Sequence, residues 1–136
     1  MKIRSDFVTN SSSTSFVIIA KDKFDLANLQ KMMGIKRGSP FEALARNLFA
    51  ILTENMSSLE KHFSHRLSLG EALDDIISSE YSSETAQRIL SAQNAGHKIF
   101  CGRMSSEEEP IQTFFCCESF ELEDRDIYID ATECTW

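Results

Sequence analysis

Two histidines and two cysteines are the residues of this chain whose types fit a metal site. His62 and His65 lie three positions apart, a spacing that places both side chains on one face of a helix. Cys101 and Cys116 fall in segments that predict paired strands, where the two thiols would share a sheet face. Together the four residues would form a Cys2His2 zinc site, but closed zinc sites usually take their ligands in tight pairs from turns. None of the four lies in a predicted turn. We therefore expect no metal, and zinc at these four residues stays as the alternative.

The other cysteines offer little thiol chemistry. Cys116 and Cys117 are adjacent, so their side chains would point to opposite faces of a strand and could not act together. A reactive thiol needs a nearby cation or helix N-terminus, and no such group flanks this pair. To act as a nucleophile, Cys134 would need a histidine that orients it. The only candidate is His97, which lies near a predicted strand end. We expect all four cysteines to be reduced, with Cys134 the most exposed of them and the buried thiols serving in packing.

Carboxylates gather near the C-terminal end of the chain, at Glu121, Glu123, Asp124, Asp126, Asp130 and Glu133. Their spacing from Asp124 is similar to part of a calcium loop, but the glycine at the sixth place and the glutamate at the twelfth are absent. The pattern instead predicts a solvated acidic sheet face that discourages edge pairing. The chain contains no G-x-S-x-G, H-E-x-x-H, dinucleotide or phosphate-loop motif. We therefore predict no catalytic residue and no cofactor.

Composition limits the classes of partner. The chain has 136 residues, a net charge of −7 and a pI of about 4.9. Its hydrophobic fraction of 42% is enough for one buried core, so we expect a single domain over residues 1–136. Nucleic acids and anionic membranes need clustered Lys and Arg, whereas the only adjacent basic pair here is Lys36 and Arg37. We expect neither as a partner.

The sequence predicts a cytoplasmic location. The apolar run from Phe16 to Ala20 is too short for the apolar part of a secretory signal. No other segment approaches the ~20 apolar residues that a membrane-spanning helix needs.

Helices are predicted in the first two thirds of the chain. Leu26, Leu29 and Met33 recur with helical spacing before Gly34, which suits a C-terminal cap. A capping box from Ser39 to Glu42 predicts the start of a longer helix, with an apolar stripe formed by Phe41, Leu44, Ala45, Leu48, Phe49 and Leu52. Further serine-marked starts are predicted at Ser57–Glu60, at Ser68–Glu71, and at Ser82 or Ser83. The first of these helices should run to about His65.

Strands are predicted at both ends. Phe16–Ala20 has the composition of a buried strand, and 97–104 and 111–117 are expected to pair, the latter as a central strand. A second hairpin follows, in which Leu122 would face Ile127 and Phe120 would face Ile129. We therefore predict one α+β domain, with a mainly antiparallel sheet of about four to five strands. The N-terminal strand and the C-terminal hairpins would form the sheet, packed against a central block of four to five helices.

The segment from Asp6 to Phe16 reads D-F-V-T-N-S-S-S-T-S-F. It resembles a recurrent N-terminal signature of small uncharacterised prokaryotic proteins, with Thr14 in place of the usual serine, and the resemblance covers residues 1–19. It implies a prokaryotic source and one specific conformation for this segment. It implies no chemistry.

We expect a non-enzymatic, cytoplasmic protein-interaction module that binds a protein partner or forms a homodimer. The basis is the lack of a catalytic motif in a core-rich, acidic α+β chain. The alternative is a small zinc- or thiol-dependent enzyme that uses His62 and His65 with Cys101 and Cys116. A third hypothesis is that the acidic hairpin mimics nucleic acid and inhibits a basic partner.

Overall fold

The protein is α+β, and its described residues form one five-stranded antiparallel sheet and six helices. The computed structural model describes residues 13–105 and 120–135, so most of the serine-rich signature and the predicted strand 111–117 lie outside the described residues. The elements follow one another as β1 (Ser13–Ala20), α1 (Leu26–Met32), α2 (Glu42–Asn55), β2 (Ser57–Ser58), α3 (Leu59–His62), α4 (Ser64–Ser68), α5 (Leu73–Glu80), α6 (Ser83–Asn94), β3 (Lys98–Ser105), β4 (Phe120–Glu123) and β5 (Ile127–Thr135).

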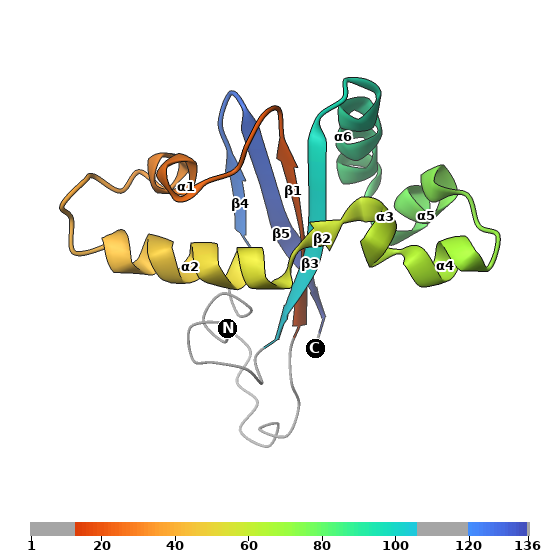
Figure 1. Cartoon of the computed structure of the whole chain (residues 1–136), viewed down its shortest axis with the longest axis horizontal. Helices are drawn as coiled ribbons and strands as arrows, with labels where there is room; N and C mark the ends of the chain where they lie inside the picture. The colour runs from red at the N-terminus through yellow and green to blue at the C-terminus, as the bar shows by residue number, and fades with distance from the viewer. Residues whose placement is uncertain (1–12, 106–119, 136) are drawn as a thin grey trace, which may run out of the picture.

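The strand β1 lies at the centre of the sheet, whose order is β2-β3-β1-β5-β4 (Figure 1). Val17 pairs with Cys101 of β3 on one side and with Asp130 of β5 on the other. An unbroken apolar run suits this position, because a strand covered on both faces has no side chain that must reach water. The predicted union of the N-terminal strand with C-terminal strands is therefore confirmed.

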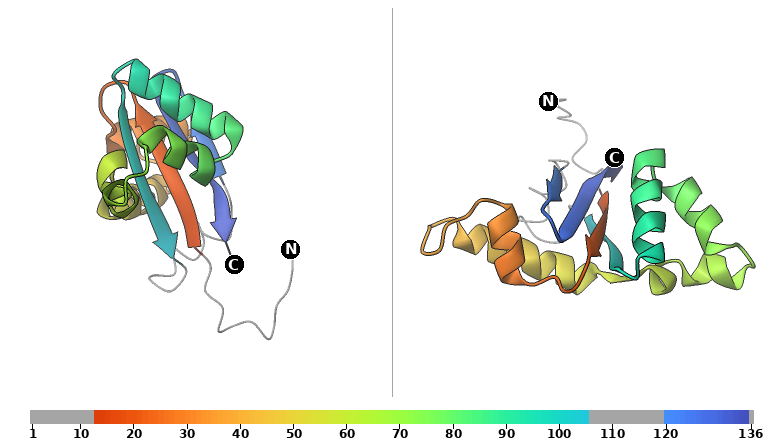
Figure 2. Two further views of the ribbon diagram at one scale, coloured as in Figure 1. Left: turned by 90° about the vertical axis from the view of Figure 1, so that its right-hand side faces the viewer. Right: turned by 90° about the horizontal axis from the view of Figure 1, so that it is seen from above.

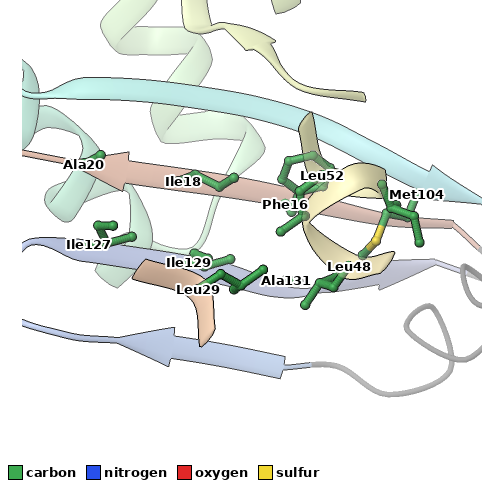
Figure 3. Packing of buried hydrophobic residues seen from close by; sticks show 11 residues of the cluster. Phe16, Ile18, Ala20, Leu29, Leu48, Leu52, Met104, Ile127, Ile129 and Ala131 are labelled. Carbon is green, nitrogen blue, oxygen red and sulfur yellow. The ribbon is translucent and has the colours of Figure 1, made fainter. Parts of the chain in front are cut away.

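Helices cover both faces of the sheet, as Figure 2 shows. Side chains alternate along β1, so Phe16 and Ile18 point to one face and Val17 and Ile19 to the other. On the first face, α1 and α2 supply Leu29, Leu48 and Leu52 to a core that also includes Met104 and Ile129 (Figure 3). On the second face, α3, α5 and α6 close a separate core, which contains Leu59, Ile76, Ile77 and Ile89. The expectation of one helical block across the sheet was wrong in this respect.

The end of α2 approaches β3 very closely at Gly102. A Cβ atom built on this glycine would lie 2.4 Å from the carbonyl oxygen of Asn55 and 2.5 Å from the ring carbon Cζ of Phe16. No side chain fits such a gap, and glycine is the residue that permits close backbone approach. Gly102 therefore sets the distance between α2 and the sheet.

The helix starts follow the serine pattern only in part. Ser82 caps α6 by accepting from the backbone N–H of Thr85 at 3.3 Å, as predicted. At α3 the cap is Ser58 rather than Ser57. The predicted cap at Ser68 is wrong, since α5 begins after Ala72 without a side-chain cap. Ser68 is instead the last residue of α4, where its hydroxyl donates to the carbonyl of His65, while Arg66 holds the carboxylate of Glu71 in two hydrogen bonds.

The hairpin register differs from the prediction by two residues. Leu122 faces Ile129 rather than Ile127, and Phe120 faces Ala131. The turn closes between Asp124, whose N–H donates to the carbonyl of Ile127 at 2.9 Å, and Ile127 itself. Because the shift is an even number of residues, the apolar side chains still face the core.

Candidate functional site

A buried polar cluster lies where β5 meets α6. Asp130 is only 4% exposed, and its Oδ2 accepts from the hydroxyl of Thr85 at 2.7 Å. The Thr85 oxygen in turn accepts from the hydroxyl of Ser82 at 3.1 Å. The predicted solvated acidic face is therefore wrong at Asp130, because α6 covers this side of the sheet.

An aromatic side chain continues the cluster towards solvent. The hydroxyl of Tyr128 donates to Glu121 Oε2 at 2.7 Å and lies 3.4 Å from Asp130 Oδ2. Burial, and next the hydrogen bond to Glu121, raises the pKa of Tyr128, so this phenol stays protonated and acts as a donor. The guanidinium of Arg88 lies 4.2 Å from the centre of the Tyr128 ring and binds Glu123 at 2.8 Å.

The cluster joins the sheet to α6 rather than facing a substrate. Asp130 and Thr85 are both almost fully buried, and a buried carboxylate is tolerated only where donors satisfy it. Thr85 lies in the first turn of α6, where the backbone N–H groups also favour a negative charge. We conclude that these side chains fix the position of α6 on β5.

The thiol of Cys101 is unsuited to nucleophilic chemistry. Cys101 is buried in the second core and accepts a hydrogen bond from the hydroxyl of Tyr81 at 3.4 Å. Burial raises its pKa to about 11 even though the Tyr81 hydrogen bond acts in the opposite direction. Since the thiolate is the reactive form, this side chain is a neutral thiol at physiological pH. Burial also raises the pKa of Tyr81.

The two histidines of the zinc alternative do not share a helix. His62 ends α3 and His65 lies in α4, with the buried Phe63 between them. The His62 ring packs edge-on against Phe63 at 4.7 Å between ring centres, and its pKa is lowered by partial burial and by the positive charge of Arg103. The prediction of one helix through His65 is therefore wrong.

In the part of the chain that the structure describes, no ligand set for the zinc alternative comes together. There, no group of three or more His, Cys, Asp or Glu side chains is placed to hold a metal ion. Cys116 and Cys117 lie outside the described residues. Cys134 pairs with Thr14 across β5 and β1, while His97 lies just before β3.

The candidate site that the structure does offer is an open groove at the connection between α1 and α2, with a volume of about 650 Å³. Its apolar surface comes from Met33, Ile35, Pro40, Phe41 and Leu44. Phe41 is 63% exposed, one of the two exposed large hydrophobic side chains in the described ranges. Below we call this the α1–α2 groove.

Local hydrogen bonds determine the shape of the α1–α2 groove. The helix α1 ends at Met32 and is followed by Gly34, which has a φ of 72° and whose N–H donates to the carbonyl of Lys31 at 3.1 Å. The hydroxyl of Ser39 accepts from the N–H of Phe41 at 3.1 Å, and the carboxylate of Glu42 accepts from the N–H of Gly38. The predicted capping box is thus wrong in its partners, because the residues before Glu42 form a turn rather than the first turn of a helix.

That turn places Phe41 on a different side from the one that the helical pattern predicts. In a helix from Ser39, Phe41 would join the stripe that includes Leu44 and Leu48. In the structure Leu48 is buried and Leu44 packs against the first core, but Phe41 precedes α2 and points away. The two glycines Gly34 and Gly38, which bracket a three-residue loop at 35–37, were the available sequence signal.

The α1–α2 groove has a positive rim. Lys36 and Arg37 line it and are exposed. Within residues 13–105 and 120–135, six ion pairs form, and neither Lys36 nor Arg37 takes part in any of them. The groove therefore offers apolar surface beside two cations that have not been neutralised by the protein's own carboxylates.

Comparison with known proteins gives no further assignment. No protein-family model matches the chain, and no curated protein or solved structure matches it either. No helix in the described portion is long and apolar enough to cross a membrane.

Proposed function

We propose that the protein is a non-enzymatic protein-interaction module and that the α1–α2 groove is its binding surface. The observation that carries this proposal is the 63% exposure of Phe41 beside other apolar side chains of the groove. Burying an aromatic side chain on binding contributes about 1.5–3 kcal/mol. Aromatic and arginine side chains supply much of the binding energy at protein interfaces, and the groove presents Phe41 next to Arg37.

The chemistry of the groove supports binding rather than catalysis. A general acid or base is normally His, Asp, Glu, Cys, Tyr or a lysine whose pKa has been shifted. Among the residues that line the groove, only Lys36 and Arg37 carry charge, and the only hydroxyl is that of Ser39. Outside the groove, Thr85 and Cys101 are both buried.

The proposal includes a cytoplasmic location and a protein partner rather than a nucleic acid. The net charge of −7 supports this, because non-specific nucleic-acid binding depends on neutralised phosphates. A prokaryotic source belongs to the same proposal. The proposed partner is a different protein. A homodimer is the alternative assembly, and the experiment below detects it as well.

The experiment compares two matched surface variants. Phe41→Ser removes the aromatic side chain of the groove, and Leu69→Ser removes the other exposed large side chain, which is 68% exposed and lies outside the groove. We expect a partner retained by the wild type and by Leu69→Ser to be lost with Phe41→Ser. Sedimentation of each protein alone separates a homodimer from a heterologous complex. Equal retention by both variants would contradict the proposal.

A further inference from the structure

We infer that the occupant of the α1–α2 groove is a short segment of another protein that carries carboxylates next to large apolar side chains. This inference rests on the proposed function and specifies the chemistry of the partner.

Charge is the first argument. Lys36 and Arg37 are the two charged residues that line the groove, and neither takes part in an ion pair among the described residues. A ligand with carboxylates supplies the missing partners, and an arginine binds a carboxylate through a planar fork.

The net charge of −7 does not prevent an acidic segment from binding. At physiological ionic strength, interactions between exposed charges are screened beyond about 8 Å. A carboxylate bound in the groove is therefore attracted by the two cations at the rim. Its repulsion by acidic residues elsewhere on the surface is largely screened.

Size is the second argument. The groove has a volume of about 650 Å³, within the range of about 300–1,000 Å³ that suits small ligands. It therefore holds a few side chains rather than a whole protein face. Two backbone hydrogen bonds fix the loop that forms the groove. The N–H of Ile35 donates to the carbonyl of Gln30 at 3.0 Å, and the N–H of Ser39 donates to the carbonyl of Lys36 at 3.0 Å. A preorganised loop reduces the entropic cost of binding.

The part of a second copy that the structure describes, residues 13–105 and 120–135, fits less well. The acidic turn at Asp124 and Asp126 offers carboxylates, but the two exposed large apolar side chains in residues 13–105 and 120–135 are Phe41 and Leu69. Leu69 is followed closely by Glu71, whose carboxylate is already held by Arg66 at 2.7 Å. Neither described segment combines a free carboxylate with a large apolar anchor.

The test measures binding of two synthetic peptides to the full chain by fluorescence anisotropy. One peptide alternates Asp and Glu with Phe and Leu, and in the other each acidic residue is replaced by Lys. The variant Lys36→Glu/Arg37→Glu reverses the rim charge. The control Lys21→Glu/Lys61→Glu makes the same change in net charge at exposed lysines outside the groove. Circular dichroism verifies that each variant is folded.

We expect the acidic peptide to bind the wild type and the control, and to bind the rim variant about tenfold more weakly. The basic peptide should prefer the rim variant. Phe41→Ser should lose both interactions. This pattern supports the inference.

Three outcomes overturn it. If the acidic peptide fails to bind, or binds the rim variant as well as the control, carboxylates do not recognise this rim. If the protein alone sediments as a dimer that Phe41→Ser dissociates, the occupant is a second copy. If charge-dependent binding persists in Phe41→Ser, the peptide binds elsewhere. The first two outcomes overturn only the inference about the chemistry of the occupant. The proposed function itself fails only if Phe41→Ser and Leu69→Ser retain the partner equally, so a failure of the inference can be distinguished from a failure of the proposed function.

Discussion

The hydroxyl of Thr85 on α6 donates to the carboxylate of Asp130 on β5 at 2.7 Å, although the two residues lie 45 positions apart in the chain. This hydrogen bond joins the helical half of the protein to the C-terminal hairpin. Asp130 also pairs through its backbone with Val17 at the centre of the sheet. Through its carboxylate and its backbone, Asp130 therefore connects three segments that are distant in sequence.

Replacing Thr85 with Val should lower the free energy of unfolding by about 1–3 kcal/mol, because the buried carboxylate loses a donor while the side-chain shape is kept. Urea denaturation monitored by circular dichroism measures the change. Thr85→Ser keeps the hydroxyl and is the matched control. Equal stability of Thr85→Val and Thr85→Ser would show that the hydrogen bond contributes nothing to folding.

Two serines that look alike in sequence should differ in their effect on stability. Ser82→Ala removes the cap of α6 and should cost about 0.5–2 kcal/mol. Ser68 precedes no helix start, since α5 begins after Ala72, so Ser68→Ala should stay within about 0.5 kcal/mol of the wild type. Thermal unfolding of the two variants measures the difference. A larger loss for Ser68→Ala would contradict the observed helix starts.

The thiol of Cys101 should resist alkylation while the protein is folded. It is buried, and burial raises its pKa to about 11, so the reactive thiolate is scarce at neutral pH. Mass spectrometry after iodoacetamide treatment should find Cys101 modified only when urea unfolds the chain. Rapid modification of the folded protein would instead favour the thiol-enzyme alternative.

The same thiol makes stability depend on pH. In the unfolded chain its pKa is about 8.5, below the value of about 11 in the folded protein. Above about pH 8.5 the unfolded state loses the proton first, so the free energy of unfolding falls as pH rises towards about 11. Cys101→Ala should remove this part of the alkaline dependence, as urea titrations at several pH values would measure. An unchanged slope would contradict the raised pKa.

Gly102→Ala should destabilise the protein by about 1–3 kcal/mol or more. The added Cβ would lie 2.4 Å from a backbone carbonyl oxygen of α2, and backbone does not move as easily as a side-chain tip. Arg103→Ala alters the next, exposed position of β3 and should stay within about 0.5 kcal/mol. Urea denaturation compares the two. A Gly102→Ala protein as stable as Arg103→Ala would show that α2 does not approach β3 this closely.

Sequence patterns predicted those helices and strands whose packing in the fold agrees with the preference of their own residues. The apolar run at Phe16–Ala20 indicated a buried strand, and alternation of Leu122 with charged residues indicated the hairpin. An error of two residues in register left Leu122 and Ile129 on the expected face. These predictions depended only on the spacing of apolar residues along the chain.

The sequence could not predict features that depend on how elements meet. Asp130 reads as one more acidic residue of a solvated face, and only the position of α6 shows that it is buried. Phe41 reads as part of a helix stripe, and only the turn formed by Gly38 and Ser39 turns it towards solvent. Both residues belong to junctions, where tertiary contacts override local preference.

Site-specific photo-cross-linking tests the binding groove most directly. Phe41→p-benzoylphenylalanine places the cross-linker within the α1–α2 groove, and the same replacement at Leu69 places it on the other exposed apolar position. In cells that produce the protein, we predict one specific protein adduct at position 41 that is absent at position 69, with mass spectrometry identifying an acidic, apolar segment at the cross-link. No adduct at position 41, or the same adducts at both positions, would contradict the assignment of the groove as the binding surface.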